Sequence, residues 1–195
     1  VKFKGEAQDQ REAQAFLQKA FLVALFVMGM ILVTQFNSFY SAFLILFAVI
    51  MSIAGVFIGL IITGQVFGIV MTGVGVIALA GIVVNNAIVM LDYVVKLRKK
   101  GYKINEAMVI ASAVRFRPVI LTAVTTVLGL MPIALGMDFD FSRENIFVFG
   151  AESARFWKSM ALAIMYGLGV TTILTLFLLP TLYSLVEGGK EKIKL

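Results

Sequence analysis

Residues 37–95 read NSFYSAFLILFAVIMSIAGVFIGLIITGQVFGIVMTGVGVIALAGIVVNNAIVMLDYVV, and this stretch decides the fold class. Its one charged side chain is Asp92. A helix needs about 20 apolar residues to cross the hydrocarbon of a bilayer, so the stretch is long enough for two crossings. Near its centre, TGQVFG at residues 63–68 interrupts the apolar pattern with two glycines and a glutamine, which predicts the turn between two helices.

Three further apolar stretches predict three more membrane helices. The chain of 195 residues is 61% hydrophobic and 14% charged, with a mean hydropathy of +0.99, whereas soluble proteins are roughly half apolar. A second uncharged turn, QFNSFYS at residues 35–41, predicts a very short connection after the first helix. We therefore predict an all-α polytopic membrane protein, a single transmembrane domain over residues 1–195 built as a bundle of five transmembrane helices. The expected spans are about 14–36, 40–62, 67–95, 118–137 and 158–186.

The distribution of Lys and Arg predicts how the bundle is oriented. Residues 96–117 hold seven of them against one acid, Glu106, which places this connector in the cytoplasm together with the tail, 187–195. Counting back through five spans puts the lead-in, 1–13, on the extracytoplasmic or periplasmic side. Within the connector, Asn105 is a candidate cap before an apolar stripe, which predicts one cytoplasmic interfacial helix. The stripe contains Met108, Ala111 and Val114.

The composition excludes several classes of function. The net charge of +6 reflects topology, because the basic residues cluster at span ends, and no nucleic-acid partner is expected. Cys and His are absent, which removes disulfides, thiolate metal ligands and the commonest general base. No other nucleophile and base pair or metal constellation is visible. We expect no enzyme activity, no metal site and no cofactor, and a protein whose main surroundings are the lipid bilayer.

The third span carries two adjacent asparagines in the sequence GIVVNNAIVMLDY, residues 81–93. Polar groups are costly in lipid, so those inside spans carry functional information. Helical spacing places Asn85 on one face with Asp92, and places Asn86 about 100° around the helix. The asparagines serve either as hydrogen bonds between helices or as part of a transport pathway. Asp92 lies one turn before Lys96, which suggests a possible ion pair at the membrane boundary. The predicted face contains Ala78, Gly81, Asn85 and Asp92.

The fourth span repeats the pattern of small and polar residues on one side. Pro118 fits the first turn of a helix, where its missing N–H costs nothing, and Pro132 should kink the span. A kinked, threonine-lined helix suits a polar conduit or a moving element. Alternatively, each threonine hydroxyl bonds the backbone carbonyl four residues earlier, as is common in membrane helices. The residues gathered on this side are Arg115, Thr122, Thr125, Thr126 and Gly129.

Three segments resemble, in order and spacing, the last three spans of the resistance-nodulation-division (RND) efflux pumps, in particular the hydrophobe/amphiphile, AcrB-like branch. They are GIVVNNAIVMLDY at 81–93, RFRPVILTAVTTVLGLMPIALG at 115–136 and WKSMALAIMYGLGVTTILTLFLLPTLYSL at 157–185. The likeness begins with FLQKAFLVALFVMGMILVTQFNSF at 16–39. The chain therefore looks like the C-terminal transmembrane half of such a pump, spans eight to twelve of twelve.

The resemblance implies a proton antiporter, driven by the proton-motive force, that exports multiple drugs and amphiphiles. It implies a place in the bacterial inner (cytoplasmic) membrane, with a periplasmic N-terminus and a cytoplasmic C-terminus. It further implies a homotrimer that works with a periplasmic adaptor and an outer-membrane channel. In this family a pair of aspartates binds the proton, and these belong to an N-terminal half that is missing from the sequence.

The resemblance also implies roles for single residues. Asn85 falls where AcrB-like members have a lysine that faces the aspartate pair, and Asn86 falls on the neighbouring family asparagine. Thr122 falls on a threonine of the proton relay, with Thr126 one turn further along, and Arg115 falls on an arginine at the cytoplasmic end of that span. A neutral amide at position 85 leaves the aspartates without an opposing cation, which either raises their proton affinity or leaves room for a different counterion. The chain is thus expected to supply the passive side of the relay.

Two other functions remain open at this point. The same domain fits a related machine of the superfamily that moves lipid or assists protein export. It also fits a stand-alone membrane module without transport. The polar start at Val1 has no signal peptide and precedes the first apolar span by many residues, so we expect a piece of a longer membrane protein.

Overall fold

Five long helices dominate the computed structural model, which describes residues 5–139, 147–149 and 152–193. The helices are α1 (Glu6–Phe36), α2 (Phe39–Thr63), α3 (Ile69–Lys99), α4 (Ile104–Ala134) and α5 (Glu152–Ile193). Two strands of three residues, β1 (Met137–Phe139) and β2 (Phe147–Phe149), pair antiparallel between α4 and α5. The prediction of an all-α bundle of five long helices is confirmed, and the short hairpin is an addition to it.

Two tight turns at opposite ends of α2 separate the first three helices. Asn37 adopts a left-handed backbone with φ 47° after α1, and the Ser38 hydroxyl accepts a hydrogen bond from the Ser41 N–H at 3.3 Å. Gly64, with φ 61°, ends α2 in a conformation that favours glycine. Both turns lie where the sequence predicts them, because polar residues and glycines interrupt an otherwise continuous apolar run.

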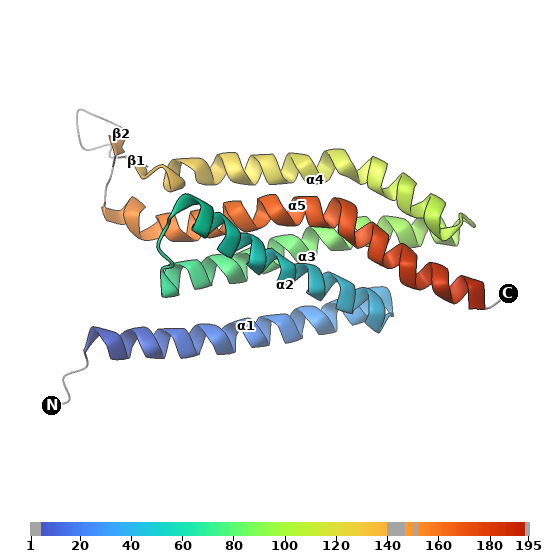
Figure 1. Cartoon of the computed structure of the whole chain (residues 1–195), viewed down its shortest axis with the longest axis horizontal. Helices are drawn as coiled ribbons and strands as arrows, with labels where there is room; N and C mark the ends of the chain where they lie inside the picture. Colours follow the sequence, from blue (N-terminus) through green and yellow to red (C-terminus); the bar gives the residue numbers. More distant parts are fainter. Residues whose placement is uncertain (1–4, 140–146, 150–151, 194–195) are drawn as a thin grey trace.

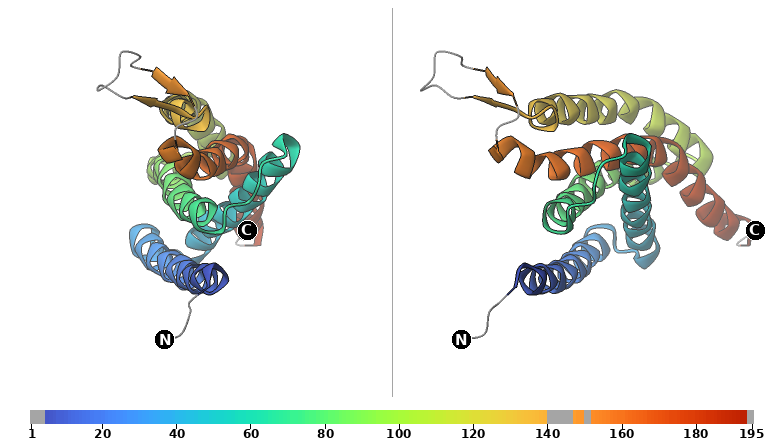
Figure 2. Two further views of the ribbon diagram at one scale, coloured as in Figure 1. Left: turned by 90° about the vertical axis from the view of Figure 1, so that its left-hand side faces the viewer. Right: turned by 60° about the vertical axis from the view of Figure 1, so that its left-hand side comes forward.

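Helix α5 is the centre of the bundle. It packs against α2, α3 and α4, and Figures 1 and 2 show it between α4 on one side and α2 and α3 on the other, with α1 at the far edge. Small residues bring these helices close, since a Cβ on Gly59 of α2 would overlap Tyr166 and one on Gly167 of α5 would overlap Leu79. The backbones therefore approach as they do in tightly packed membrane helices.

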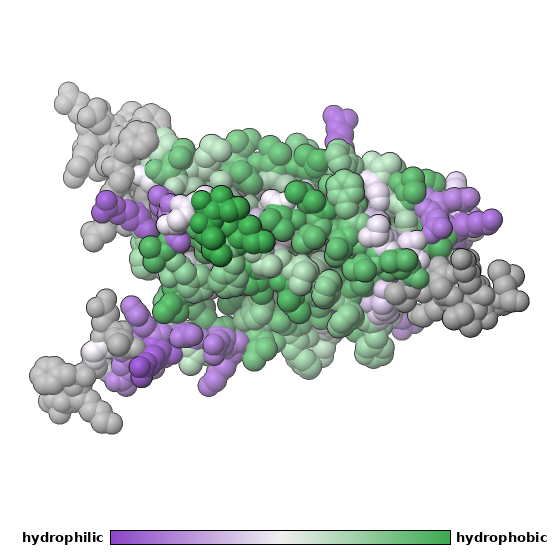
Figure 3. All heavy atoms as spheres, in the orientation of Figure 1, coloured by the Kyte–Doolittle hydropathy of each residue, from purple (hydrophilic) through white to green (hydrophobic). Residues whose placement is uncertain are grey.

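The outer surface of the bundle is apolar along most of its length. All five helices are long and apolar enough to cross a membrane. Figure 3 shows hydrophobic atoms across the middle of the molecule and hydrophilic groups mainly towards its two ends. Phe26, Ile61 and Phe177 are exposed large side chains from three different helices. A surface of this kind suits contact with lipid hydrocarbon, where exposed apolar groups cost nothing.

The start of α4 differs from the sequence prediction. Residues 104–117 were expected to form a separate interfacial helix, but they are the first turns of α4, and the connector shrinks to residues 100–103. Two residues of the predicted apolar stripe, Met108 and Ala111, are buried against the bundle core together with Ile104 and Ala107, whereas Val114 is 48% exposed. The buried side chains pack on the protein core and not on the membrane surface. Asn105 is not the cap, because Lys103 holds that position.

Each of the three prolines lies inside a helix. Pro118 lies in the interior of α4, whereas the sequence placed it in a first turn. Pro132 lies in the last turn of α4 and so does not kink the middle of the span. Pro180 lies within α5, which changes direction along its length in Figure 1. Membrane helices tolerate proline because neighbouring groups and local adjustments satisfy the carbonyls that it leaves free.

Candidate functional site

One face of α3 is open. Between residues 71 and 95 only three residues are exposed, namely Ala78, Gly81 and Asn85. They follow one another at spacings of three and four, so they form a single stripe along the helix. A Cβ on Gly81 would meet no other atom within 4 Å. None of the helices in the described part of the chain covers this stripe, although its small residues suit close helix packing.

Asn86 faces the interior of the bundle. It is 6% exposed, and its neighbours along the helix, Val83, Ala87 and Met90, belong to the bundle core. The two adjacent asparagines therefore separate, with Asn85 on the open stripe and Asn86 enclosed in the bundle. The structure places only the first of them where a further helix can reach it.

Helix α4 carries a second stripe of small and polar residues. Thr122 is exposed, Thr126 is half-buried, and a Cβ on Gly129 would meet nothing within 4 Å. The Thr122 hydroxyl donates to Val119 O at 2.9 Å, and the Thr126 hydroxyl donates to Thr122 O at 2.8 Å. Thr125, also exposed, donates in the same way to Leu121 O at 2.9 Å. These donors are satisfied within the helix, while each hydroxyl oxygen keeps the capacity to accept a hydrogen bond.

A contact between Arg115 and Tyr93 sets the two stripes at the same depth. The guanidinium carbon of Arg115 lies 4.9 Å from the centroid of the Tyr93 ring, and α3 and α4 run in opposite directions (Figure 1). Counting from this contact reaches Asn85 eight residues back along α3 and Thr122 seven residues forward along α4, so the two lie at a similar depth. The same count pairs Gly81 with Thr126 and Ala78 with Gly129.

Arg115 stands at the end of the α4 stripe nearest the α3–α4 turn. Its side chain is half-buried, and its Nε is buried without a hydrogen-bond partner among the described residues. A buried donor without an acceptor is costly, and a cation–π contact of about 0.5–2 kcal/mol offsets only part of that cost. Arg115 is therefore poised to bind an acceptor that the described part of the chain does not supply.

Asp92 and Lys96 form an ion pair near the end of α3. Lys96 Nζ lies 2.7 Å from Asp92 Oδ2, with the two side chains 63% and 35% exposed. Pairs of this exposure contribute about 0–1 kcal/mol. Asp92 is about 10 Å from Asn85 along the helix axis, so the pair is separate from the polar stripe.

Two contacts in this region join residues that the sequence did not connect. Tyr93 is not among the residues to which the sequence assigns a role, although it follows Asp92 directly, because only the packing of α3 on α4 brings it to Arg115. Ser184 Oγ of α5 donates to Asn105 Oδ1 of α4 at 2.6 Å. Their 79-residue separation leaves no local pattern in the sequence.

Comparisons with known proteins give a consistent result. A family model described as the AcrB/AcrD/AcrF family matches residues 1–187. The swarming motility protein SwrC of Bacillus subtilis is 30% identical over 188 residues, and the cobalt-zinc-cadmium resistance protein CzcA of Cupriavidus metallidurans is 31% identical over 187 residues. Each alignment covers 96% of this chain but 17% and 16% of the relative. The multidrug resistance protein MdtC of Erwinia tasmaniensis is 32% identical over 120 residues, 61% of this chain and 10% of that protein.

A solved structure shares the fold. The crystal structure of a heavy metal efflux pump superposes with a TM-score of 0.76 and 31% identity, covering 94% of this chain and 17% of that one. The chain thus spans 16–17% of the length of SwrC, CzcA and this pump.

Proposed function

Because the chain belongs to the AcrB/AcrD/AcrF family of RND transporters, we propose that it is the C-terminal transmembrane part of an efflux transporter driven by the proton-motive force. In that transporter it supplies the passive side of the proton relay. Its polar side chains serve as hydrogen-bond partners for acidic groups on the other transmembrane half. The chain is then a component of a secondary active transporter, a proton antiporter, and carries out no covalent chemistry.

The open polar stripe on α3 and α4 carries this proposal. Asn85 and Thr122 are exposed on helices that are apolar enough to span a membrane. An amide turned towards lipid loses its hydrogen bonds to water, at a cost of roughly 2 kcal/mol or more. Gly81 and Gly129 leave the space beside these side chains empty. A helix of the other transmembrane half fits this space and supplies the missing hydrogen-bond partners.

The relay residues take different parts in this transport cycle. An asparagine amide donates to a carboxylate and accepts from a carboxylic acid, so Asn85 can bind a facing acid in both protonation states. Thr122 lies at the same depth and adds a hydroxyl oxygen. Asn86 and Thr126 flank this pair, one enclosed in the bundle and the other half-buried. Arg115 places a fixed positive charge about 10 Å from Thr122, towards the α3–α4 turn.

We place the transporter in the inner membrane of a bacterium, with the start of α1 in the periplasm and the end of α5 in the cytoplasm. The basic residues between α3 and α4 support this orientation. The family suggests a homotrimer that works with a periplasmic adaptor and an outer-membrane channel.

For the substrate we propose amphiphilic organic molecules, including drugs, because the relative MdtC is a multidrug resistance protein. Divalent metal cations are the second candidate, because CzcA is a cobalt-zinc-cadmium resistance protein and the similar solved structure is a heavy metal efflux pump. Growth of a pump-deficient strain that expresses the complete transporter separates the two. Resistance to amphiphilic drugs without resistance to cobalt, zinc or cadmium salts supports the first, and the reverse pattern supports the second.

The relay role is tested by Asn85→Ala and Thr122→Ala in the complete transporter, with proton flux into proteoliposomes as the readout. A hydrogen bond to a charged group contributes about 1.5–3 kcal/mol, so each change should lower flux by roughly 10-fold or more. Thr34→Ala is the matched control, because Thr34 is also exposed and donates to Met30 O at 2.9 Å, but lies on α1. Unchanged proton flux in both Asn85→Ala and Thr122→Ala would contradict the relay role.

A further inference from the structure

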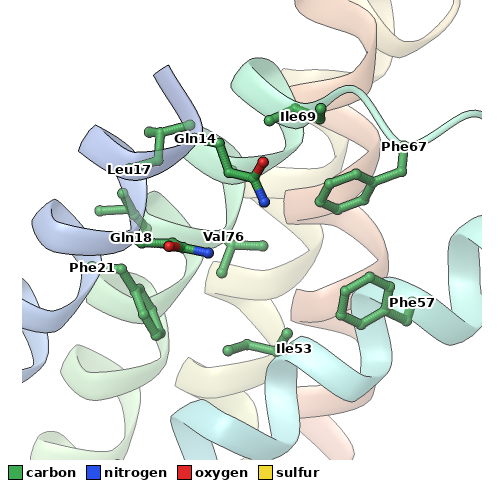
Figure 4. Close-up of a pocket in the computed structure, with 11 residues that line it drawn as sticks. Gln14, Leu17, Gln18, Phe21, Ile53, Phe57, Phe67, Ile69 and Val76 are labelled. Carbon is green, nitrogen blue, oxygen red and sulfur yellow. The ribbon is translucent and has the colours of Figure 1, made fainter. Parts of the chain in front are cut away.

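A pocket opens between α1, α2 and α3 (Figure 4). Its volume is about 270 Å³. Three phenylalanines line it, Phe21 from α1, Phe57 from α2 and Phe67 from the turn before α3. Phe57 and Phe67 stack with their ring centroids 5.7 Å apart. All three helices are long and apolar enough to cross a membrane.

Two glutamines give this apolar pocket a polar rim. Gln14 and Gln18 are one turn apart on α1, and Figure 4 shows their amide groups pointing from α1 towards the space beside Phe67 and Val76. Among the described residues that line the pocket, none is charged. The rim therefore offers neutral hydrogen-bond donors and acceptors directly above an aromatic and aliphatic interior.

Charge, polarity and hydrophobicity follow one another along the same face of α1. Arg11, Gln14, Gln18 and Phe21 are spaced by three, four and three residues. Arg11 is exposed one turn outside the pocket, and Phe21 lies about 15 Å deeper along the helix. A phospholipid presents its phosphate, its ester carbonyls and its acyl chain in this order, with the phosphate and the esters in the polar layer outside the hydrocarbon core.

We propose that this pocket binds one acyl chain of a bilayer phospholipid. The ester carbonyl accepts hydrogen bonds from the amides of Gln14 and Gln18, and the phosphate lies beside the guanidinium of Arg11.

The bound lipid joins α1 to the rest of the bundle. Helix α1 has 6% of its apolar window buried, against 39% for α2 and 50% for α3. Its contact with α3 is close at Gly73, where a Cβ would lie 2.9 Å from Leu17 Cδ1. Both residues line the pocket, so a chain bound there extends this contact. The site does not involve Asn85 or Thr122 and does not depend on the proton relay.

The test uses the complete transporter in nanodiscs that contain phosphatidylethanolamine with a photoactivatable diazirine in its acyl chain. Mass spectrometry after irradiation measures labelling of Leu17 to Phe21 and, for comparison, of Ile61 and Ile62, which are 78% and 79% exposed on α2. We expect pocket labelling to saturate as the labelled fraction of lipid rises, and labelling of the two isoleucines to rise linearly.

Variants make this test specific to the pocket. Val76→Trp fills the pocket and should lower its labelling at least about fivefold, whereas Val23→Trp adds the same bulk to an α1 residue that is 61% exposed outside it. The double change Gln14→Leu with Gln18→Leu removes the rim and should lower labelling about fivefold without added bulk. Gln10→Leu, also exposed on α1, is its control.

Two results would overturn the lipid site. The first is pocket labelling that rises linearly with the labelled fraction of lipid and is equal in Val76→Trp and the unmodified protein. This result would mean that no lipid is held there. Saturating labelling by a photoactivatable alkyl maltoside that excess phospholipid does not reduce means that the pocket takes a different amphiphile. Neither result depends on proton flux, so either can occur whether or not the relay role holds.

Discussion

The guanidinium of Arg115 on α4 lies 4.9 Å from the centroid of the Tyr93 ring on α3. This contact joins the two helices close to their connecting turn. It sets Asn85 and Thr122 at one depth because both lie seven or eight residues away from it along antiparallel helices. The position of the polar stripe therefore depends on a contact outside the stripe.

Replacing Tyr93 tests whether this contact holds Arg115 in place. Tyr93→Phe keeps the aromatic face and should leave proton flux of the complete transporter nearly unchanged. Tyr93→Leu removes a cation–π interaction of about 0.5–2 kcal/mol and should lower both the thermal unfolding midpoint and the flux. Equal behaviour of the two variants would show that the ring does not position Arg115.

Replacing Gly81 tests whether another helix packs on the open stripe. A Cβ on Gly81 meets no atom of the described bundle within 4 Å, so Gly81→Leu should lower proton flux and the unfolding midpoint only if the other transmembrane half lies there. Gly169→Leu is the matched control. A Cβ on Gly169 also meets nothing within 4 Å, and it shares a side of α5 with Ile173 and Phe177, large residues that are 62% and 67% exposed. Full activity of both variants would place the other half elsewhere.

The close contact of α2 and α5 predicts a stability effect at Gly59. A methyl group there overlaps Cβ and Cγ of Tyr166, and the Cβ cannot move without shifting the helix. Gly59→Ala should destabilise the complete transporter by about 1–3 kcal/mol, measured by denaturant or thermal unfolding in detergent. Gly169→Ala, made at an open position, should change stability by much less. Similar stabilities for the two variants would mean that α2 and α5 pack less closely.

The ion pair between Asp92 and Lys96 should matter little. Its side chains are 35% and 63% exposed, and pairs of this kind contribute at most about 1 kcal/mol. We expect Asp92→Asn to retain most of the proton flux under conditions in which Asn85→Ala loses it. A loss in Asp92→Asn as large as that in Asn85→Ala would place Asp92 in the relay.

The number of helices and the turns on either side of α2 were predictable because they depend on local composition. Apolar runs define the spans, and Asn37 and Gly64 mark where the chain reverses. The start of α4 was not predictable in this way. An apolar stripe of this kind fits a membrane surface and a protein core equally well. Only the folded structure shows that it packs against the core.

The candidate site was predictable in part, because the spacing of residues along one helix defines which of them share a face. Helical spacing places Ala78, Gly81 and Asn85 on one face, and these are the residues that the structure leaves exposed. The separation of Asn85 from the enclosed Asn86 follows from how the other helices pack on α3, which no spacing within α3 specifies. The contact between Arg115 and Tyr93 likewise requires two helices that meet only in the folded bundle.

The central claim, that Asn85 faces the proton-binding acids of the other transmembrane half, is tested most directly by Asn85→Lys in the complete transporter. A lysine cation favours the ionised form of a nearby carboxyl group and so lowers its pKa. The measurement is proton flux into proteoliposomes as a function of pH. We predict that the pH dependence shifts to lower pH in Asn85→Lys, while Thr34→Lys on α1 leaves it unchanged. An unshifted profile in an Asn85→Lys transporter that still conducts protons would contradict the account.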